Sequence, residues 1–228
     1  YFARDITEFW KRWHISLTTW LRDYIFLPLS FKLSYRIHSQ KVLGIRSDHF
    51  IYIAASLVTW FLTGLWHGAN YTFVLWGMIN GLFLILYHLQ AKPRKKLLRR
   101  LKINNNNNVL VMAETMMTLF IIVLSWVFFR AENVADAVTY IDRMFSKSLV
   151  TMPHVFVAGL QSVVSSSLLI AMVIFYFFLE WKGRNHQNDF STSGLRFKRP
   201  LRWAVYFSLI LLVLFLSGNN QQFIYFQF

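Results

Sequence analysis

Apolar residues fill the stretch from Phe50 to Ala91, which contains no Asp, Glu, Lys or Arg. This stretch is roughly twice as long as the ~20 residues that one helix needs to cross a bilayer. Its middle holds a polar break, Trp66-His67-Gly68-Ala69-Asn70, where a first span has to turn into a second. We therefore predict a helical hairpin over residues 50–89.

Three further apolar runs follow the hairpin, at residues 109–129, 156–178 and 203–217. Their length and composition predict one transmembrane helix each. Together with the hairpin they make five spans. The expected fold class is therefore an all-α polytopic membrane protein, with residues 1–228 forming a single membrane domain.

Residues 1–30 mix aromatic and charged side chains and contain no apolar run of bilayer length. The aromatic and apolar positions recur at steps of three and four, which is typical of one face of a helix: Trp10, Trp13, Leu17, Trp20 and Tyr24. This pattern predicts an interfacial or re-entrant helix whose aromatic stripe faces protein or acyl chains. Pro28 is expected to end or kink it.

The distribution of Lys and Arg predicts the topology. Cations are concentrated at residues 31–49, 92–102 and 182–202, which places these segments on the cytoplasmic side. Residues 130–154 carry balanced charges at helical spacing and are expected to form a short amphipathic helix on the outer side. This alternation places His67 toward the extracytoplasmic end of its hairpin.

Several single features of the loops and spans carry structural predictions. Gly77 and Gly81 are four residues apart, as expected for small residues that let two helices approach closely. The asparagine run at residues 104–108 predicts a flexible loop without chemistry of its own. Glu114 is expected to be a solvated or lysine-paired carboxylate near the cytoplasmic end of its span.

Composition narrows the class further. The chain is 56% hydrophobic and 18% aromatic, with 23 Phe and 9 Trp, which is typical of a membrane protein and unusual for a soluble domain. The formal net charge of +14 does not indicate nucleic-acid binding, because the cations cluster in short loops beside apolar runs. Cysteine is absent, which excludes disulfides and thiolate sites within these residues. Residue 1 is Tyr and the first residues already have a helical pattern, so we expect the chain to begin inside a longer protein.

His67 is the first candidate for chemistry. No His, Asp or Glu lies three or four residues from it, so no metal site is predicted there. Neither a Gly-x-Ser-x-Gly elbow nor a glycine-rich phosphate loop is present. A neutral imidazole in apolar surroundings suits removal of a proton from a hydroxyl nucleophile. The alternative is a tolerated polar residue at the tip of a hairpin.

His14 is the second candidate, within Phe9-Trp10-Lys11-Arg12-Trp13-His14-Ile15-Ser16-Leu17. One interpretation is an aromatic belt at the membrane interface with snorkelling cations. The other is the polar lining of a cavity. Spacing alone leaves both open.

Two of these stretches closely resemble the bacterial branch of the membrane-bound O-acyltransferase family, which includes alginate and peptidoglycan O-acetyltransferases. They are ITEFWKRWHISLTTWLRDY at residues 6–24 and GLWHGAN at residues 64–70. SWVFFRA at residues 125–131 and FIYFQF at residues 223–228 are similar to the same branch. Residues 30–36 depart from it, because the alginate-type members usually have a glycine-rich basic loop there. This departure leaves the acceptor and the subfamily open.

The resemblance implies the site residues. His67 matches the catalytic histidine of the family, and His14 matches its second characteristic histidine, which would orient the substrate or polarise the thioester carbonyl. The neighbouring motif residues are substrate-binding or cavity-lining candidates: Trp66, Asn70, Trp13, Arg22, Asp23 and Tyr24. A buried Arg22-Asp23 pair would either hold the fold together or bind substrate.

The resemblance also implies the reaction. An acyl group, acetyl in the simplest case, would pass from a cytoplasmic thioester such as acetyl-CoA, through a tunnel, to an extracytoplasmic polysaccharide such as alginate or peptidoglycan. No bound cofactor is implied. A partner acetyltransferase of the SGNH type and a location in the cell inner membrane are expected, and the chain would be the C-terminal half of the fold. The alternative function is a transporter or export subunit without acyl-transfer chemistry. A third reading is that this half of the protein is inactive by itself.

Overall fold

The computed structural model describes residues 1–146 and, beyond them, residues 167, 170–178, 180, 199–200, 203–204, 206–207 and 210–211. The chain divides into two compact units, Tyr1–Thr151 and Met152–Phe228, and the fold below is that of the first. The predicted spans at 156–178 and 203–217 lie largely outside the described residues, so the count of five spans stays a prediction.

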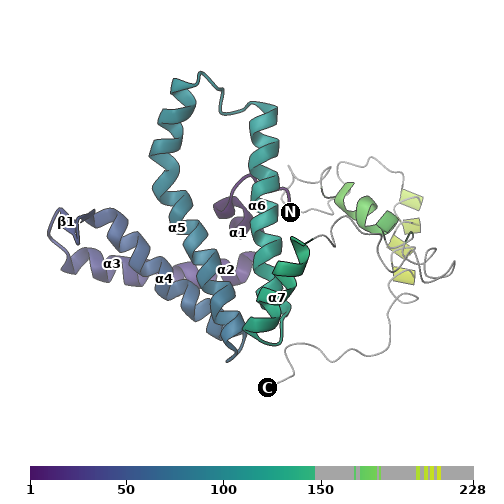
Figure 1. Cartoon of the computed structure of the whole chain (residues 1–228), viewed down its shortest axis with the longest axis horizontal. Helices are drawn as coiled ribbons and strands as arrows, with labels where there is room; N and C mark the ends of the chain where they lie inside the picture. The colour runs from purple at the N-terminus through teal and green to yellow at the C-terminus, as the bar shows by residue number, and fades with distance from the viewer. Residues whose placement is uncertain are drawn as a thin grey trace. The chain divides into compact units, whose positions relative to one another are not determined.

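Three helices of the first unit are long and apolar enough to cross a membrane: α4 (Ser47–His67), α5 (Tyr71–Arg100) and α6 (Asn108–Arg130). They confirm the hairpin and the span that follows it. In Figure 1, α5 and α6 run beside each other and are joined by the loop at the top of the view. The protein is therefore a helical, multi-pass membrane protein.

Glycines hold α4 and α5 together at close range. A Cβ added at Gly77 would lie 2.3 Å from the carbonyl oxygen of Trp60, and one added at Gly64 would lie 2.6 Å from the carbonyl oxygen of Phe73. Gly81 lies against the Trp60 side chain in the same way. Because any side chain would push the backbones apart, the prediction that Gly77 and Gly81 are packing residues is confirmed.

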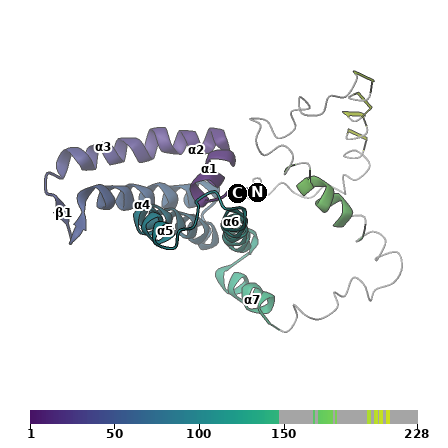
Figure 2. The same cartoon turned by 90° about the horizontal axis from the view of Figure 1, so that it is seen from above.

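The single helix predicted for residues 1–30 is wrong. The segment forms α1 (Ile6–Arg12) and α2 (Ile15–Leu21), followed by the π-helical turn η1 (Arg22–Phe26) and α3 (Leu27–Arg36). Trp13 is extended and His14 adopts φ 46° and ψ 49°, a left-handed conformation that interrupts the helix. Figure 2 shows α2 and α3 as one rod alongside α4.

Pro28 does not end the helix, contrary to one of the two predicted outcomes. It occupies the start of α3, and the helix continues to Arg36. Proline lacks an N–H and its ring clashes with the carbonyl four residues earlier. The π-helical register of η1 immediately precedes it, and a wider turn of this kind relieves such a clash.

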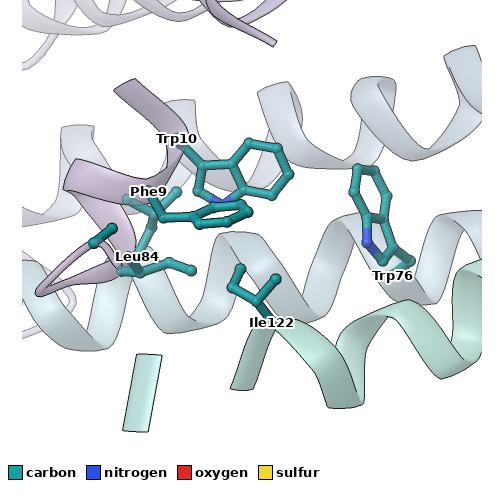
Figure 3. Close-up of a cluster of buried hydrophobic side chains, with 7 residues drawn as sticks. Phe9, Trp10, Trp76, Leu84 and Ile122 are labelled. Atoms are coloured by element: carbon teal, nitrogen blue, oxygen red, sulfur yellow. The ribbon is translucent and has the colours of Figure 1, made fainter. Parts of the chain in front are cut away.

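The predicted aromatic stripe is divided between two environments. Trp10 is 6% exposed, whereas Trp20 and Tyr24 are 50% and 69% exposed. The break at His14 turns the two halves in different directions, which spacing in a continuous helix cannot anticipate. The buried half joins α5 and α6 in the main apolar cluster of Ala3, Ile6, Phe9, Trp10, Trp76, Leu84 and Ile122 (Figure 3).

The remaining elements complete the first unit. A short hairpin, β1 (Lys41–Val42) and β2 (Ile45–Arg46), connects α3 to α4. The basic segment predicted as a loop after residue 89 is helical, because α5 continues through Pro93 to Arg100. Helix α7 (Val134–Met144) confirms the predicted amphipathic helix within 130–154.

Glu114 of α6 forms ion pairs with two arginines, Arg4 and Arg94. The prediction of a solvated or lysine-paired carboxylate is therefore wrong. The side chains of the three residues are between 20% and 28% exposed. The same arginines bond to Asn105, with Arg4 Nη2 donating to its carbonyl oxygen at 2.6 Å. The asparagine run is therefore part of a structural junction that ties the segment before α1 to α5 and α6, contrary to the prediction.

Replacing Glu114 by Gln is expected to destabilise the first unit, because it leaves two partly buried guanidinium groups facing each other. Breaking a fully buried ion pair costs about 3–5 kcal/mol, and the partial exposure here lowers the expected loss to about 2 kcal/mol. Thermal unfolding of the purified protein in detergent measures the change. Asp48→Asn is the matched control, since its pair with Arg46 is exposed to solvent and should contribute little to stability. Equal effects of the two variants would contradict the structural role of Glu114.

Candidate active site

His67 is the last residue of α4, and Gly68 is the reason that the helix ends there. Gly68 has φ 154° and ψ 163°, a conformation that is essentially restricted to glycine. Its N–H donates to the carbonyl oxygen of Leu65 at 3.1 Å. The Trp-His-Gly sequence thus fixes a histidine at a helix terminus, with the chain turning directly after it.

The imidazole of His67 is enclosed by aromatic rings from three helices. It is 5% exposed, and its ring centre lies 4.8 Å from Trp66, 5.0 Å from Trp76 and 5.0 Å from Phe129. The contacts with these rings are edge-to-face. Because α4, α5 and α6 each supply one of them, the position of the imidazole depends on the packing of the whole helical unit.

His14 reaches the same region from the N-terminal segment. The left-handed conformation at this residue separates α1 from α2 and leaves the side chain exposed. His14 is close enough to His67 for the charges of the two imidazoles to interact. The two histidines that the sequence singles out therefore lie within range of electrostatic interaction, one at the end of α4 and the other at the break between α1 and α2.

The backbone conformation of His14 also points to a functional role for this residue. A left-handed conformation costs a residue with a side chain about 1–2 kcal/mol, and such outliers concentrate at functional sites. The carbonyl oxygen of His14 accepts from the N–H of Thr18 at 2.9 Å, so the strained residue also starts α2. The adjacent α1 is anchored in the apolar cluster, which holds the break in place.

Trp13 packs against His14, with ring centres 6.0 Å apart, and its predicted role as a cavity-lining residue stays a prediction. Its ring stacks on Phe9 with centres 5.6 Å apart and an angle of 15°, and it lies 5.5 Å from Trp126 of α6. Tyr1 packs against the edge of the same ring at 5.6 Å. Trp13 therefore fixes the end of α1 next to His14.

Trp66 and Asn70 lie on the two sides of the turn that follows His67. Trp66 is 57% exposed beside the imidazole. Asn70 caps α5, because its Oδ1 accepts from the Thr72 N–H at 3.1 Å and its Nδ2 donates to the Glu132 carbonyl oxygen at 2.7 Å. Asn70 thus joins the turn to the connection between α6 and α7, and its role toward a substrate stays a prediction.

Arg22, Asp23 and Tyr24 form part of η1, on its exposed side. The expected buried pair is wrong, since the Arg22 and Asp23 side chains are 60% and 40% exposed and bond to each other at 2.8 Å. The carboxylate of Asp23 raises the pKa of Arg22, which keeps the guanidinium charged. Tyr24 packs against Trp20, with ring centres 5.6 Å apart. These three residues lie on a surface and not inside the described unit.

Two residues next to His67, Trp76 and Phe129, were missed by sequence reasoning. Phe129 lies in the SWVFFRA stretch, but nothing in that stretch indicates which of its aromatic residues points inward. Trp76 has a weak signal, since it shares a four-residue spacing with Thr72 and Asn80 on α5. All three side chains of that spacing are buried.

The described residues hold no group of three or more His, Asp or Glu side chains placed to bind a metal ion. Within this part of the chain, the candidate chemistry is that of two imidazoles near an aromatic cluster. A neutral imidazole can accept a proton from a hydroxyl and return it to a leaving group. That arrangement suits acid-base chemistry on a substrate that reaches the hairpin turn.

Comparison with known proteins covers both histidines. Residues 1–131 match the profile of MBOAT, the membrane-bound O-acyltransferase family. The probable alginate O-acetylase AlgI of Pseudomonas aeruginosa is 34% identical over 178 residues, which is 78% of this chain and 30% of that protein. The AlgI of Azotobacter vinelandii is 34% identical over 175 residues.

Two other kinds of relative match more distantly. The peptidoglycan O-acetyltransferase of Helicobacter pylori is 28% identical over 154 residues, covering 68% of this chain and 25% of that protein. The teichoic acid D-alanyltransferase of Bacillus subtilis is 27% identical over 96 residues. The chain spans about 30% of the length of the alginate O-acetylases that it matches.

Proposed function

Because this chain belongs to the membrane-bound O-acyltransferase family, we propose that it forms part of an enzyme that transfers an acyl group to hydroxyls of a polysaccharide outside the cytoplasm. The observation that carries this proposal is the pair of histidines. His67 is buried at the end of α4, and the strained His14 lies within its electrostatic range. Both fall inside the residues that match the family.

The proposed reaction uses His67 as a general base. Its imidazole takes the proton of the acceptor hydroxyl as the hydroxyl oxygen bonds to the thioester carbonyl carbon. The carbon–sulfur bond then breaks, and the imidazolium gives the proton to the departing thiolate, so that the products are the ester and the free thiol and the base is neutral again. His14, on the exposed side, would orient the substrate or polarise the carbonyl. The same chemistry applies if the hydroxyl belongs to a carrier that relays the acyl group outward.

The donor, acceptor and partner are parts of this proposal. Acetyl-CoA is the proposed donor, and alginate or peptidoglycan the proposed acceptor, because proteins named for acetylation of these two polymers are similar over most of this chain. A D-alanyltransferase is similar over a shorter region, so other acyl groups remain part of the test. We further propose the cell inner membrane as the location and an SGNH-type acetyltransferase as the partner.

A labelled-donor experiment tests the proposed function. Membrane vesicles carrying the full-length protein receive radiolabelled acetyl-CoA outside and candidate polysaccharides inside. Label in the polysaccharide is the expected result. The rival transporter function predicts flux of unmodified polysaccharide and no label in any acceptor, an outcome that would refute the acyltransferase proposal.

Replacing His14 by Ala is expected to reduce label transfer by about tenfold to a hundredfold without abolishing it, since the residue assists and does not act as the base. Initial rates in the same vesicles measure the effect. Trp20→Ala is the matched control, because this exposed residue of α2 lies outside the histidine pair. Full activity of His14→Ala, or an equal loss in Trp20→Ala, would remove His14 from the mechanism.

A further inference from the structure

Buried polar atoms lie on the faces of α1 and α5 that meet in the core, and the Trp76 ring that carries one of them lies beside His67. Four of them have no hydrogen-bond partner among the described residues: Trp10 Nε1, Thr72 Oγ1, Trp76 Nε1 and Asn80 Oδ1. The residues that carry them are 6% exposed or less. Such groups are rare in the interior of a protein, and several together call for an explanation.

These atoms are close together in the fold. Thr72, Trp76 and Asn80 follow one another at four-residue intervals and so lie along one face of α5. The rings of Trp76 and Trp10 are 5.8 Å apart, and the Trp76 ring is 5.0 Å from His67. Figure 3 shows Trp10 above Ile122 and Trp76 to the right of both, with the nitrogen edge of Trp76 facing the side on which Trp10 lies.

The chemistry of each unpaired group determines which kind of hydrogen-bond partner it lacks. An indole N–H can only donate, so Trp10 and Trp76 both require an acceptor. Asn80 Nδ2 already donates to the Trp76 carbonyl oxygen at 2.8 Å, which leaves its Oδ1 directed elsewhere. An unpaired buried donor costs about 1–3 kcal/mol, and an acceptor brought by a substrate recovers that cost.

We propose that the indole N–H of Trp76 binds the carbonyl oxygen of the acyl thioester. This inference rests on the proposed function, in which His67 acts on the same substrate. The position fits, because a donor beside the base lies where the carbonyl must be when the hydroxyl attacks. As the carbonyl oxygen gains negative charge, a preset donor in an apolar site stabilises it.

Infrared spectroscopy tests the hydrogen bond directly. Acetyl-CoA labelled with ¹³C at the carbonyl is added to the full-length protein without acceptor, so that no transfer occurs. When acetyl-CoA is bound to the wild type, its ¹³C=O stretch is expected at a lower frequency than when it is dissolved in a water-free solvent. Trp76→Phe keeps an aromatic ring but removes the N–H, and the shift should be lost. Trp60→Phe is the matched control, since its ring packs on the same cluster.

Kinetics gives the second readout. Trp76→Phe should lower kcat about a hundredfold, as the loss of one oxyanion donor does elsewhere, with KM changed less than threefold. A purely structural role would instead lower thermal stability and activity in Trp76→Phe and Trp60→Phe alike. That outcome, or a ¹³C=O shift unaffected by Trp76→Phe, would overturn the inference.

The two proposals fail in different ways. If the proposed function is wrong, the wild type transfers no label and retains no ¹³C=O band after free donor is removed. If only the Trp76 inference is wrong, the wild type binds and transfers the acyl group, and Trp76→Phe does the same.

Discussion

His67→Ala is expected to abolish acyl transfer in vesicles, lowering the rate by about a thousandfold, while the protein accumulates at the wild-type level. A positioned general base contributes about 10²–10⁴-fold, and no other imidazole is held by rings from α4, α5 and α6 in the described part of the chain. Initial rates of label transfer at matched protein amount measure the effect. His67→Gln should be equally inactive, because the amide fills similar space without accepting a proton.

His88→Ala is the matched control for this prediction. His88 also lies on a membrane-spanning helix, where its Nε2 is 3.2 Å from Nδ1 of His49, and it stacks on Tyr52. The histidine-to-alanine change is chemically the same in both variants, so their difference isolates the position. Activity within about threefold of the wild type is expected for His88→Ala. An active His67→Ala protein would show that His67 is not the general base.

Gly77→Val is expected to prevent stable folding of the hairpin. Even the Cβ of alanine would lie 2.3 Å from the Trp60 carbonyl oxygen and 3.0 Å from the Gly64 backbone nitrogen, so the two helices must separate. Inserting a small group into a packed interior costs about 1–3 kcal/mol of folding free energy. We expect Gly77→Ala to lie at the upper end of this range, because its Cβ would clash with backbone atoms, and Gly77→Val to cost more, because its side chain is larger. Thermal unfolding in detergent and the yield of monodisperse protein measure the loss.

Leu82→Ala is the control for Gly77, on the exposed side of the same helix. It should leave the unfolding temperature nearly unchanged and the yield normal. If Gly77→Val folded as well as Leu82→Ala, the close approach of α4 and α5 would be wrong. His67 would then lose the frame that positions it, since Trp76 precedes Gly77 directly.

The hairpin and its turn were predictable because local rules decide them. A long apolar stretch sets two spans, and small residues at four-residue spacing set the close contact of Gly77 with α4. The turn needs a residue that tolerates the backbone angles of Gly68, and the sequence supplies it directly after His67. The outcome for these features required no knowledge of distant contacts.

The N-terminal segment was predicted poorly because tertiary contacts override its periodicity. The break at His14 has no proline or glycine to announce it, and it follows from the anchoring of α1 in the core by Phe9 and Trp10. The Arg4–Glu114 pair joins residues far apart in the sequence, so spacing could not reveal it. The π-helical turn before Pro28 likewise depends on the packing of η1 against α4.

The candidate site was also only partly predictable from the sequence. His67 and His14 were identifiable as residues, but their proximity depends on where α1 ends relative to the hairpin turn. The exposure of Arg22 and Asp23 is a property of the π-helical turn, and the sequence motif alone suggested burial. Trp76 and Phe129 became visible only once α5 and α6 were packed around the imidazole.

The most direct measurement counts two products in one reaction. Vesicles carrying the full-length protein receive labelled acetyl-CoA and acceptor polysaccharide, and the free thiol released and the label held in base-labile ester are followed together. Equal amounts of thiol and ester are expected in the wild type, and neither product above background in His67→Ala. Polysaccharide that crosses the membrane unmodified without thiol release, or equal product formation by His67→Ala, would contradict the role of His67 as the general base of an acyl transfer.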